Sequence, residues 1–136
     1  MVVEKVAPII IRERDGVREL LVFRHPTAAV QIVKGTVEPG EDLADAALRE
    51  LAEESGIASI TSIESKGPWF VELTNQNWNF FLCSTNESLP DAWDFYTLDD
   101  GGLVYSFFWF PVDQPPGTDW HPVYQAALIQ IRSLIN

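Results

Sequence analysis

Residues 35–57 read GTVEPGEDLADAALRELAEESGI. The second part of this stretch predicts a helix from about Glu41 to Ser55, because apolar residues recur there at helical spacing. These apolar residues are Leu43, Ala47, Leu48 and Leu51. The acidic side chains of Glu41 and Asp42 suit the positive end of the helix dipole. Gly56 stands where a C-terminal cap is expected.

Three glutamates, Glu50, Glu53 and Glu54, share one face of this predicted helix. At this spacing neighbouring Cβ atoms are roughly 5–6 Å apart, and like charges destabilise a helix. A cation between them would relieve the repulsion. Mg²⁺ fits, because it prefers carboxylate oxygens and also binds substrate phosphates. Taken alone, however, three glutamates are more typical of a solvated acidic helix face.

The complete spacing is far more specific than the three acids. Five residues separate the first glycine from the first acid, and seven separate that acid from the arginine. The full pattern is Gly35, Glu41, Arg49-Glu50, Leu51, Glu53-Glu54, Gly56 and Ile57. It resembles the Nudix box at every specified position, a match expected by chance on the order of once in ten million such chains. The resemblance implies an α/β (α+β) fold: one domain over residues 1–136, a Nudix-type α/β/α sandwich whose mixed central sheet is flanked by helices.

The resemblance also implies roles for individual residues. The metal ligands would be Glu50, Glu53, Glu54 and the main-chain carbonyl of Lys34. Arg49 and Glu41 would hold the helix and its glutamates in place, completing the catalytic set. The implied reaction is a Mg²⁺-dependent hydrolysis, with Mn²⁺ as a possible substitute. A metal-activated water would attack one phosphorus of a diphosphate linkage in a nucleoside diphosphate joined to another moiety.

The base that accepts the proton of this water is left open by the sequence. In the family it is a box glutamate or an acid of a later loop. The polar stretch 84–102 offers Glu87, Asp91, Asp94, Asp99 and Asp100. Asp99 and Asp100 directly precede a glycine pair and a strand, so they could point into a cleft, and of the two we take Asp100 as the candidate. The competing interpretation is an ordinary solvated loop acid.

Three further residues are candidates for contacts with the substrate. Arg24 could hold a terminal phosphate with two hydrogen bonds, or could be a surface charge at a strand end. Lys34 lies directly before the box and is also a candidate substrate contact. Trp93 could stack on a nucleobase, or could be a hydrophobic plug that pins its loop.

Short apolar runs rich in β-branched residues predict strands around the box. They cover residues 6–14, 18–24, 29–33, 58–65, 68–73, 77–83 and 103–112. Asp15-Gly16 predicts a tight turn between the first two, and residues 84–102 read as a loop. Asp119 is expected to cap a last helix whose apolar face starts at Trp120. Strands flanked by two helices predict a mixed α/β domain.

The charge of the chain narrows the class of partner. The net charge is −11, and from Leu51 onward there are 11 acids but only two bases, Lys66 and Arg132. The chain therefore lacks the cluster of basic residues that would neutralise the phosphates of a long nucleic acid. A small nucleotide-type substrate is compatible with an acidic protein when a divalent metal supplies the positive charge.

The remaining features of the sequence predict a cytoplasmic protein. The single cysteine, Cys83, is expected to be a small buried apolar residue. The chain has no basic-then-apolar start, so no signal peptide is expected, and its apolar runs are too short to cross a membrane. A homodimer is compatible with the sequence.

A second hypothesis is a nucleotide-binding or regulatory module that has the Nudix fold but no turnover. Such members commonly lose box glutamates, whereas all are kept here. The segment KGTVEPGED is similar to a stretch of Nudix enzymes that cleave diadenosine polyphosphates or capped RNA ends. Nucleoside triphosphates, nucleotide sugars and dinucleotide cofactors also stay open as substrates.

Overall fold

The computed structural model describes residues 1–136, apart from the side chain of Asp100. Its long strands are β1 (Val3–Arg14), β2 (Val17–Arg24), β5 (Ile60–Val71), β6 (Gln76–Thr85), β7 (Ala92–Thr97) and β8 (Leu103–Pro111). Two very short strands, β3 (Val30–Gln31) and β4 (Gly35–Thr36), lie between β2 and the first helix. The helices are α1 (Leu43–Ser55) and α2 (Pro122–Leu134), and single 3-10 turns form η1 (Glu72–Thr74) and η2 (Asp99–Gly101).

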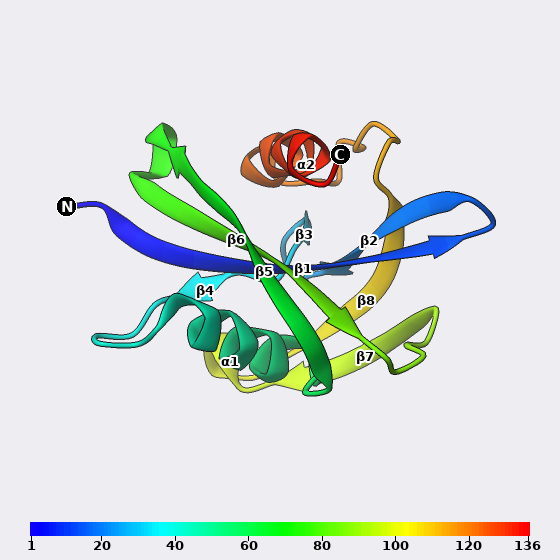
Figure 1. Cartoon of the computed structure of the whole chain (residues 1–136), viewed down its shortest axis with the longest axis horizontal. Coiled ribbons are helices and arrows are strands. Elements are labelled where there is room, and N and C mark those ends of the chain that lie inside the picture. Colours follow the sequence, from blue (N-terminus) through cyan, green and yellow to red (C-terminus); the bar gives the residue numbers. More distant parts are fainter.

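The strands form one mixed sheet between the two helices, with α2 above it and α1 below it in Figure 1. The order is β5-β6-β1-β2-β8-β7, with β3 paired to β2 and β4 paired to β1. Neighbours are antiparallel except β1 and β6, which run parallel. This is the predicted α/β/α sandwich with a mixed central sheet. No helix in the described part of the chain is long and apolar enough to cross a membrane.

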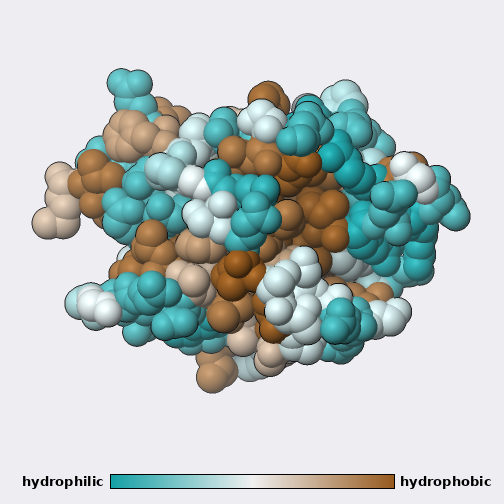
Figure 2. Space-filling model, viewed as in Figure 1, coloured by the Kyte–Doolittle hydropathy of each residue, from teal (hydrophilic) through white to brown (hydrophobic). Residues whose placement is uncertain are grey.

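Each face of the sheet packs against one helix. Strand alternation in β1 sends Ala7 and Ile9 toward α2, and Val6 and Ile10 toward α1. The α2 side is filled by Leu20, Trp78, Phe80, Tyr124, Leu128 and Ile131. The α1 side is filled by Ala46, Ala47, Leu51, Phe81, Cys83 and Phe107. In the view of Figure 2, apolar surface gathers over the middle of the molecule and hydrophilic side chains surround it.

The C-terminal end of α1 is as predicted, whereas the helix begins at Leu43 rather than near Glu41. Asp42 is the N-cap, and its carboxylate accepts a hydrogen bond from the backbone N–H of Asp45. Gly56 adopts a left-handed conformation with φ 80° and donates its N–H to the carbonyl of Ala52. An added Cβ at Gly56 would also lie 2.6 Å from the Phe95 ring. The two caps fix where the helix begins and ends, and therefore which face of it carries the glutamates.

The loop predicted at 84–102 is wrong in part, because β7 (Ala92–Thr97) lies within it. Trp93 and Phe95 are half-buried, whereas Asp94 and Tyr96 are exposed, so the segment does alternate as a strand should. The alternation is only six residues long and includes one acid, Asp94, on its exposed face. Pairing with β8, which lies further along the chain, makes it a strand.

Three other element predictions also need correction. Residues 58–65 and 68–73 are not two strands but mostly one, β5, which continues through a register irregularity before Gly67. The third predicted strand shortens to the two residues of β3. The last helix begins later than predicted, and its N-cap is His121 rather than Asp119. The Nδ1 atom of His121 accepts the N–H of Val123, while Asp119 pairs with Arg24.

Candidate active site

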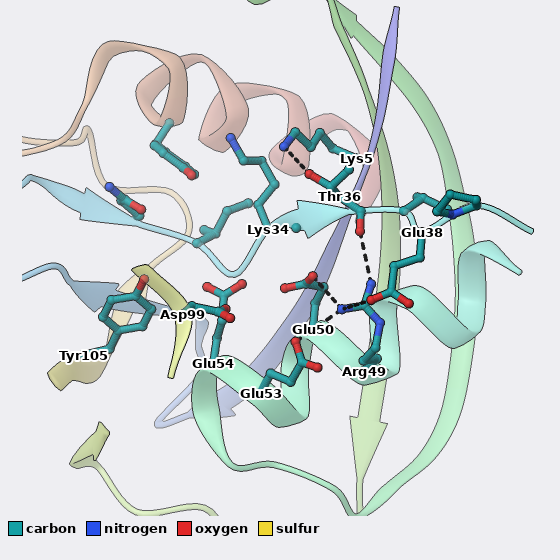
Figure 3. A pocket seen from close by; sticks show the side chains of 16 residues that line it. Lys5, Lys34, Thr36, Glu38, Arg49, Glu50, Glu53, Glu54, Asp99 and Tyr105 are labelled. Atoms are coloured by element: carbon teal, nitrogen blue, oxygen red, sulfur yellow. Dashed lines mark hydrogen bonds and ion pairs between the residues drawn. The ribbon is translucent and has the colours of Figure 1, made fainter. Parts of the chain in front are cut away.

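The glutamates of α1 line a cavity of about 630 Å³ that reaches from α1 toward α2. Figure 3 shows Glu50, Glu53 and Glu54 rising from α1 on one side of β4, and Lys5 and Lys34 on the other. Asp99 and Tyr105 complete the wall near Glu54. The cavity therefore has an anionic side and a cationic side, which suits a ligand that carries phosphates and is bound partly through metal.

Gly35 allows the acidic helix to approach β4 closely. An added Cβ at this position would lie 1.8 Å from the Cδ atom of Glu50, inside its carboxyl group. The requirement for glycine is steric, because the φ angle of Gly35 lies outside the left-handed range. Glu50 is 7% exposed and occupies this space. The first glycine of the box thus fixes where this carboxylate stands.

Arg49 is the centre of the hydrogen-bond network beside the acids. Its Nε and Nη2 atoms donate to both oxygens of Glu41, at 2.8 and 2.9 Å. Nη1 donates to Glu50 at 2.9 Å and to Glu53 at 3.2 Å, and Nη2 also reaches the carbonyl of Thr36. The hydrogen bonds from Arg49 lower the pKa of Glu41 to about 2. Arg49 therefore ties the loop before α1 to two of its glutamates.

Glu54 is only 5% exposed. It is therefore buried and does not lie on a charged helix face in solvent, as was expected for the three glutamates. Burial and, to a smaller extent, the neighbouring Glu50 together raise the pKa of Glu54 to about 10. Burial also raises the pKa of Glu53, against the lowering effect of Arg49. The protein therefore holds carboxylates where their charge is costly unless a cation is present.

A carboxylate from outside the box joins this group. Oxygen atoms of Glu50, Glu53 and Asp99 lie within 4.8 Å of one another. Asp99 comes from η2, which follows β7, so the pairing of β7 with β8 brings this distant segment to the end of α1. Converging carboxylate oxygens, one of them buried, are the donor set that suits Mg²⁺ or Mn²⁺. The residues present fit a divalent cation.

The NUDIX domain family model matches residues 4–128. The chain belongs to the NUDIX domain family. A crystal structure of C. elegans Ap4A hydrolase is similar to this chain at 25% identity, with a TM-score of 0.62, covering 99% of this chain and 94% of that chain. No curated protein sequence matches this chain.

Two further structures share the Nudix fold at lower identity. The M. smegmatis Nudix hydrolase RenU is 14% identical, with a TM-score of 0.67, covering 97% of this chain and 85% of that chain. The NUDIX domain of Shewanella oneidensis NrtR, solved with ADP ribose, is 13% identical, with a TM-score of 0.63, covering 100% and 90%. With the family match, the enzyme class is that of the Nudix hydrolases, which are pyrophosphohydrolases.

The structure places the weaker candidates for this Nudix site in different surroundings. Lys34 lines the cavity. Arg24 does not line it and pairs with Asp119 at 3.0 Å. Trp93 lies outside the cavity, stacks on Phe107 and donates its Nε1 hydrogen to the carbonyl of Ser55, which is the geometry of a plug. The side chain of Asp100 lies outside the described residues.

Reasoning from the sequence considered Asp99 only as one of several possible bases and missed Lys5. The place of Asp99 beside the box glutamates depends on the path of β7. Lys5 lies 30 residues before the box and enters the cavity because β1 pairs with β4, with Lys5 opposite Thr36. No local pattern marks a lone lysine at the start of a strand.

Proposed function

We propose that this Nudix hydrolase cleaves a diphosphate linkage in a nucleoside diphosphate joined to another moiety, with Mg²⁺ as the physiological metal. The observation that carries the proposal is the convergence of Glu50, Glu53 and Asp99 beside the buried Glu54. Two of the similar structures point to the same substrate class, since one is an Ap4A hydrolase and one holds ADP ribose.

In this proposal the carboxylates bind the metal ions and accept a proton. Glu50, Glu53 and Asp99 would share the divalent ions, with Glu54 and the carbonyl of Lys34 as further ligands. Bound ions would lower the pKa of an attacking water and offset the charge of the departing phosphate. A carboxylate of the same group, all of whose members line the cavity, would accept the proton of that water.

Arg49 and Glu41 act as positioning residues. The two-pronged contact between them anchors the guanidinium, which in turn orients the oxygens of Glu50 and Glu53. Carboxylates whose orientation is already fixed before the reaction need little rearrangement when charge develops in the transition state, and this lowers the activation barrier.

A panel of nucleotide substrates tests this function. ADP-ribose, nucleoside triphosphates, nucleotide sugars and dinucleoside polyphosphates are incubated with Mg²⁺, with Mn²⁺ or with excess chelator, and products are separated by chromatography. We expect two phosphorylated products from at least one substrate, and less than about one-hundredth of that rate in chelator, because metal supplies several kcal/mol of charge stabilisation. Full activity in chelator would contradict the metal-dependent mechanism. Binding of a nucleotide without any turnover would favour the regulatory module instead.

A further inference from the structure

The C-terminal turn of α1 ends in main-chain carbonyls that the helix itself does not satisfy. The last four carbonyls of an α-helix have no regular donor within the helix. The N–H of Ile57, four residues after Glu53, donates to the hydroxyl of Ser55 rather than to the carbonyl of Glu53. The carbonyls of this turn therefore need donors from another part of the fold.

Strand β7, which lies beside α1 (Figure 1), supplies two of these donors. Residues at alternate positions of a strand point to the same side. Trp93 donates its Nε1 hydrogen to the carbonyl of Ser55 at 3.1 Å. The hydroxyl of Thr97, four residues further along the strand, donates to the carbonyl of Glu53 at 2.9 Å. Side chains of β7 thus hold the end of the helix that carries Glu53.

The hydroxyl of Thr97 makes a second hydrogen bond, to the turn that carries Asp99. It accepts the main-chain N–H of Asp99 at 3.2 Å. The carbonyl of Asp99 in turn accepts the N–H of Gly102 at 3.1 Å, so the main chain of Asp99 is held on both sides. Thr97 is only 1% exposed, which leaves water little access to these bonds. One buried hydroxyl therefore joins the main chain of Glu53 to that of Asp99.

Glu53 and Asp99 belong to the carboxylate cluster of the cavity. Their oxygens and those of Glu50 lie within 4.8 Å of one another. Negative charges at such distances repel when no cation is present, and this repulsion favours movement of η2 away from α1. The hydroxyl of Thr97 opposes that movement. Contacts that orient metal ligands before the metal arrives raise its affinity.

We propose that Thr97 is a positioning residue of the metal site, which holds Asp99 against Glu53 and so sets the affinity for the divalent cation. This inference rests on the proposed function, because the site that Thr97 would organise is the metal cluster proposed there. Thr97 does not line the active-site cavity, and we assign it no contact with metal or substrate. Its effect passes through the main chain of its two partners.

Titration of the metal-free protein with Mn²⁺, followed by the electron paramagnetic resonance signal of the unbound ion, tests this role. Thr97→Val keeps the branched shape of the side chain but removes the hydroxyl. It should weaken Mn²⁺ binding by about tenfold, the lower end of what loss of a residue that orients metal ligands commonly costs. Thr97→Ser keeps the hydroxyl and should stay within about twofold of the unmodified protein. If Thr97→Val does not fold, Thr97→Ala and Thr97→Ser give the same comparison, since they differ in the hydroxyl alone.

Thr85→Val is the matched control. Thr85 ends β6 and makes the same pair of hydrogen bonds, donating to the carbonyl of Ser59 and accepting the N–H of Glu87, outside the active-site cavity. Loss of this hydroxyl should leave Mn²⁺ affinity unchanged. Thermal melts in chelator check that every variant is folded at the temperature of the titration.

A double variant tests whether the effect of Thr97 passes through Asp99. When Thr97→Val is added to Asp99→Asn, Mn²⁺ affinity should fall by less than about twofold further, because effects that share one route are not additive. A loss of equal size in both backgrounds would show that the hydroxyl only caps α1, and the proposal would be wrong. The same conclusion follows if Thr97→Val binds Mn²⁺ as tightly as the unmodified protein.

Failure of the proposed function can be told apart from failure of this inference, because the titration needs no substrate. If the nucleotide panel shows no turnover, the proposed function fails while the Mn²⁺ affinities still decide the role of Thr97. If the panel shows turnover but Thr97→Val keeps full Mn²⁺ affinity, only the inference fails. No Mn²⁺ binding by the unmodified protein up to several millimolar would overturn both the metal site and the role of Thr97.

Discussion

Glu53→Gln and Glu54→Gln should each lower kcat by roughly 10²–10⁴-fold, which corresponds to about 3–5 kcal/mol of transition-state stabilisation. Glutamine keeps the size and polarity of the side chain but removes the charge that attracts a divalent cation. Asp45→Asn is the control, because Asp45 lies on the same helix with its side chain in solvent. It should leave kcat within a few-fold. Steady-state rates on the best substrate of the panel decide the comparison, and three variants that behave alike would identify an ordinary charged helix face.

The Glu54→Gln variant should also be more stable than the unmodified protein when metal is absent. Because burial raises the pKa of Glu54 in the folded state to about 10, the wild-type protein loses stability as pH rises above the unfolded-state pKa, near 4.3. Thermal melts in chelator should therefore show a melting temperature a few degrees higher for Glu54→Gln at pH 8, and no difference near pH 4. In Mg²⁺ the order should reverse, since only the native carboxylate gains stability from metal binding.

Gly35→Ala should cost about 100-fold or more in kcat/KM, although it adds a single methyl group. The added Cβ would overlap the carboxyl group of Glu50, so either β4 or that side chain must move. Displacement of a catalytic group by about 1 Å commonly costs 10²-fold in rate. Gly117→Ala is the matched control, because both glycines have φ outside the left-handed range and the nearest obstacle to Gly117 is the movable end of Asp119. Near-native activity in Gly35→Ala would show that Glu50 need not stand where the structure places it.

Local sequence patterns were sufficient to predict the helix that carries the glutamates of the site. The spacing of apolar residues, the acids of the first turn and the glycine at position 56 specify α1 and its rotation, since each acts within one or two turns of helix. The Asp15-Gly16 turn likewise follows from dihedral angles that glycine and aspartate tolerate. The box therefore locates its glutamates along the chain and on the helix surface.

What surrounds those glutamates depends on contacts between distant segments. Glu54 is buried in the folded chain, whereas the helix pattern alone indicates a solvated face. Asp99 reaches the cluster through β7, whose six residues look like loop until β8 pairs with them. Lys5 enters the cavity through the register of β1 against β4. None of these features has a signal within a short window of sequence.

The proposed mechanism depends above all on the binding of divalent metal by the cluster of Glu50, Glu53 and Asp99. Titration of the metal-free protein with Mn²⁺, followed by the electron paramagnetic resonance signal of the unbound ion, measures this without any substrate. We expect a dissociation constant in the millimolar range or tighter for the unmodified protein and for Asp45→Asn, and an affinity at least about tenfold weaker for Glu53→Gln and for Asp99→Asn. Equal Mn²⁺ affinity in all four proteins, or no binding up to several millimolar, would contradict the claim.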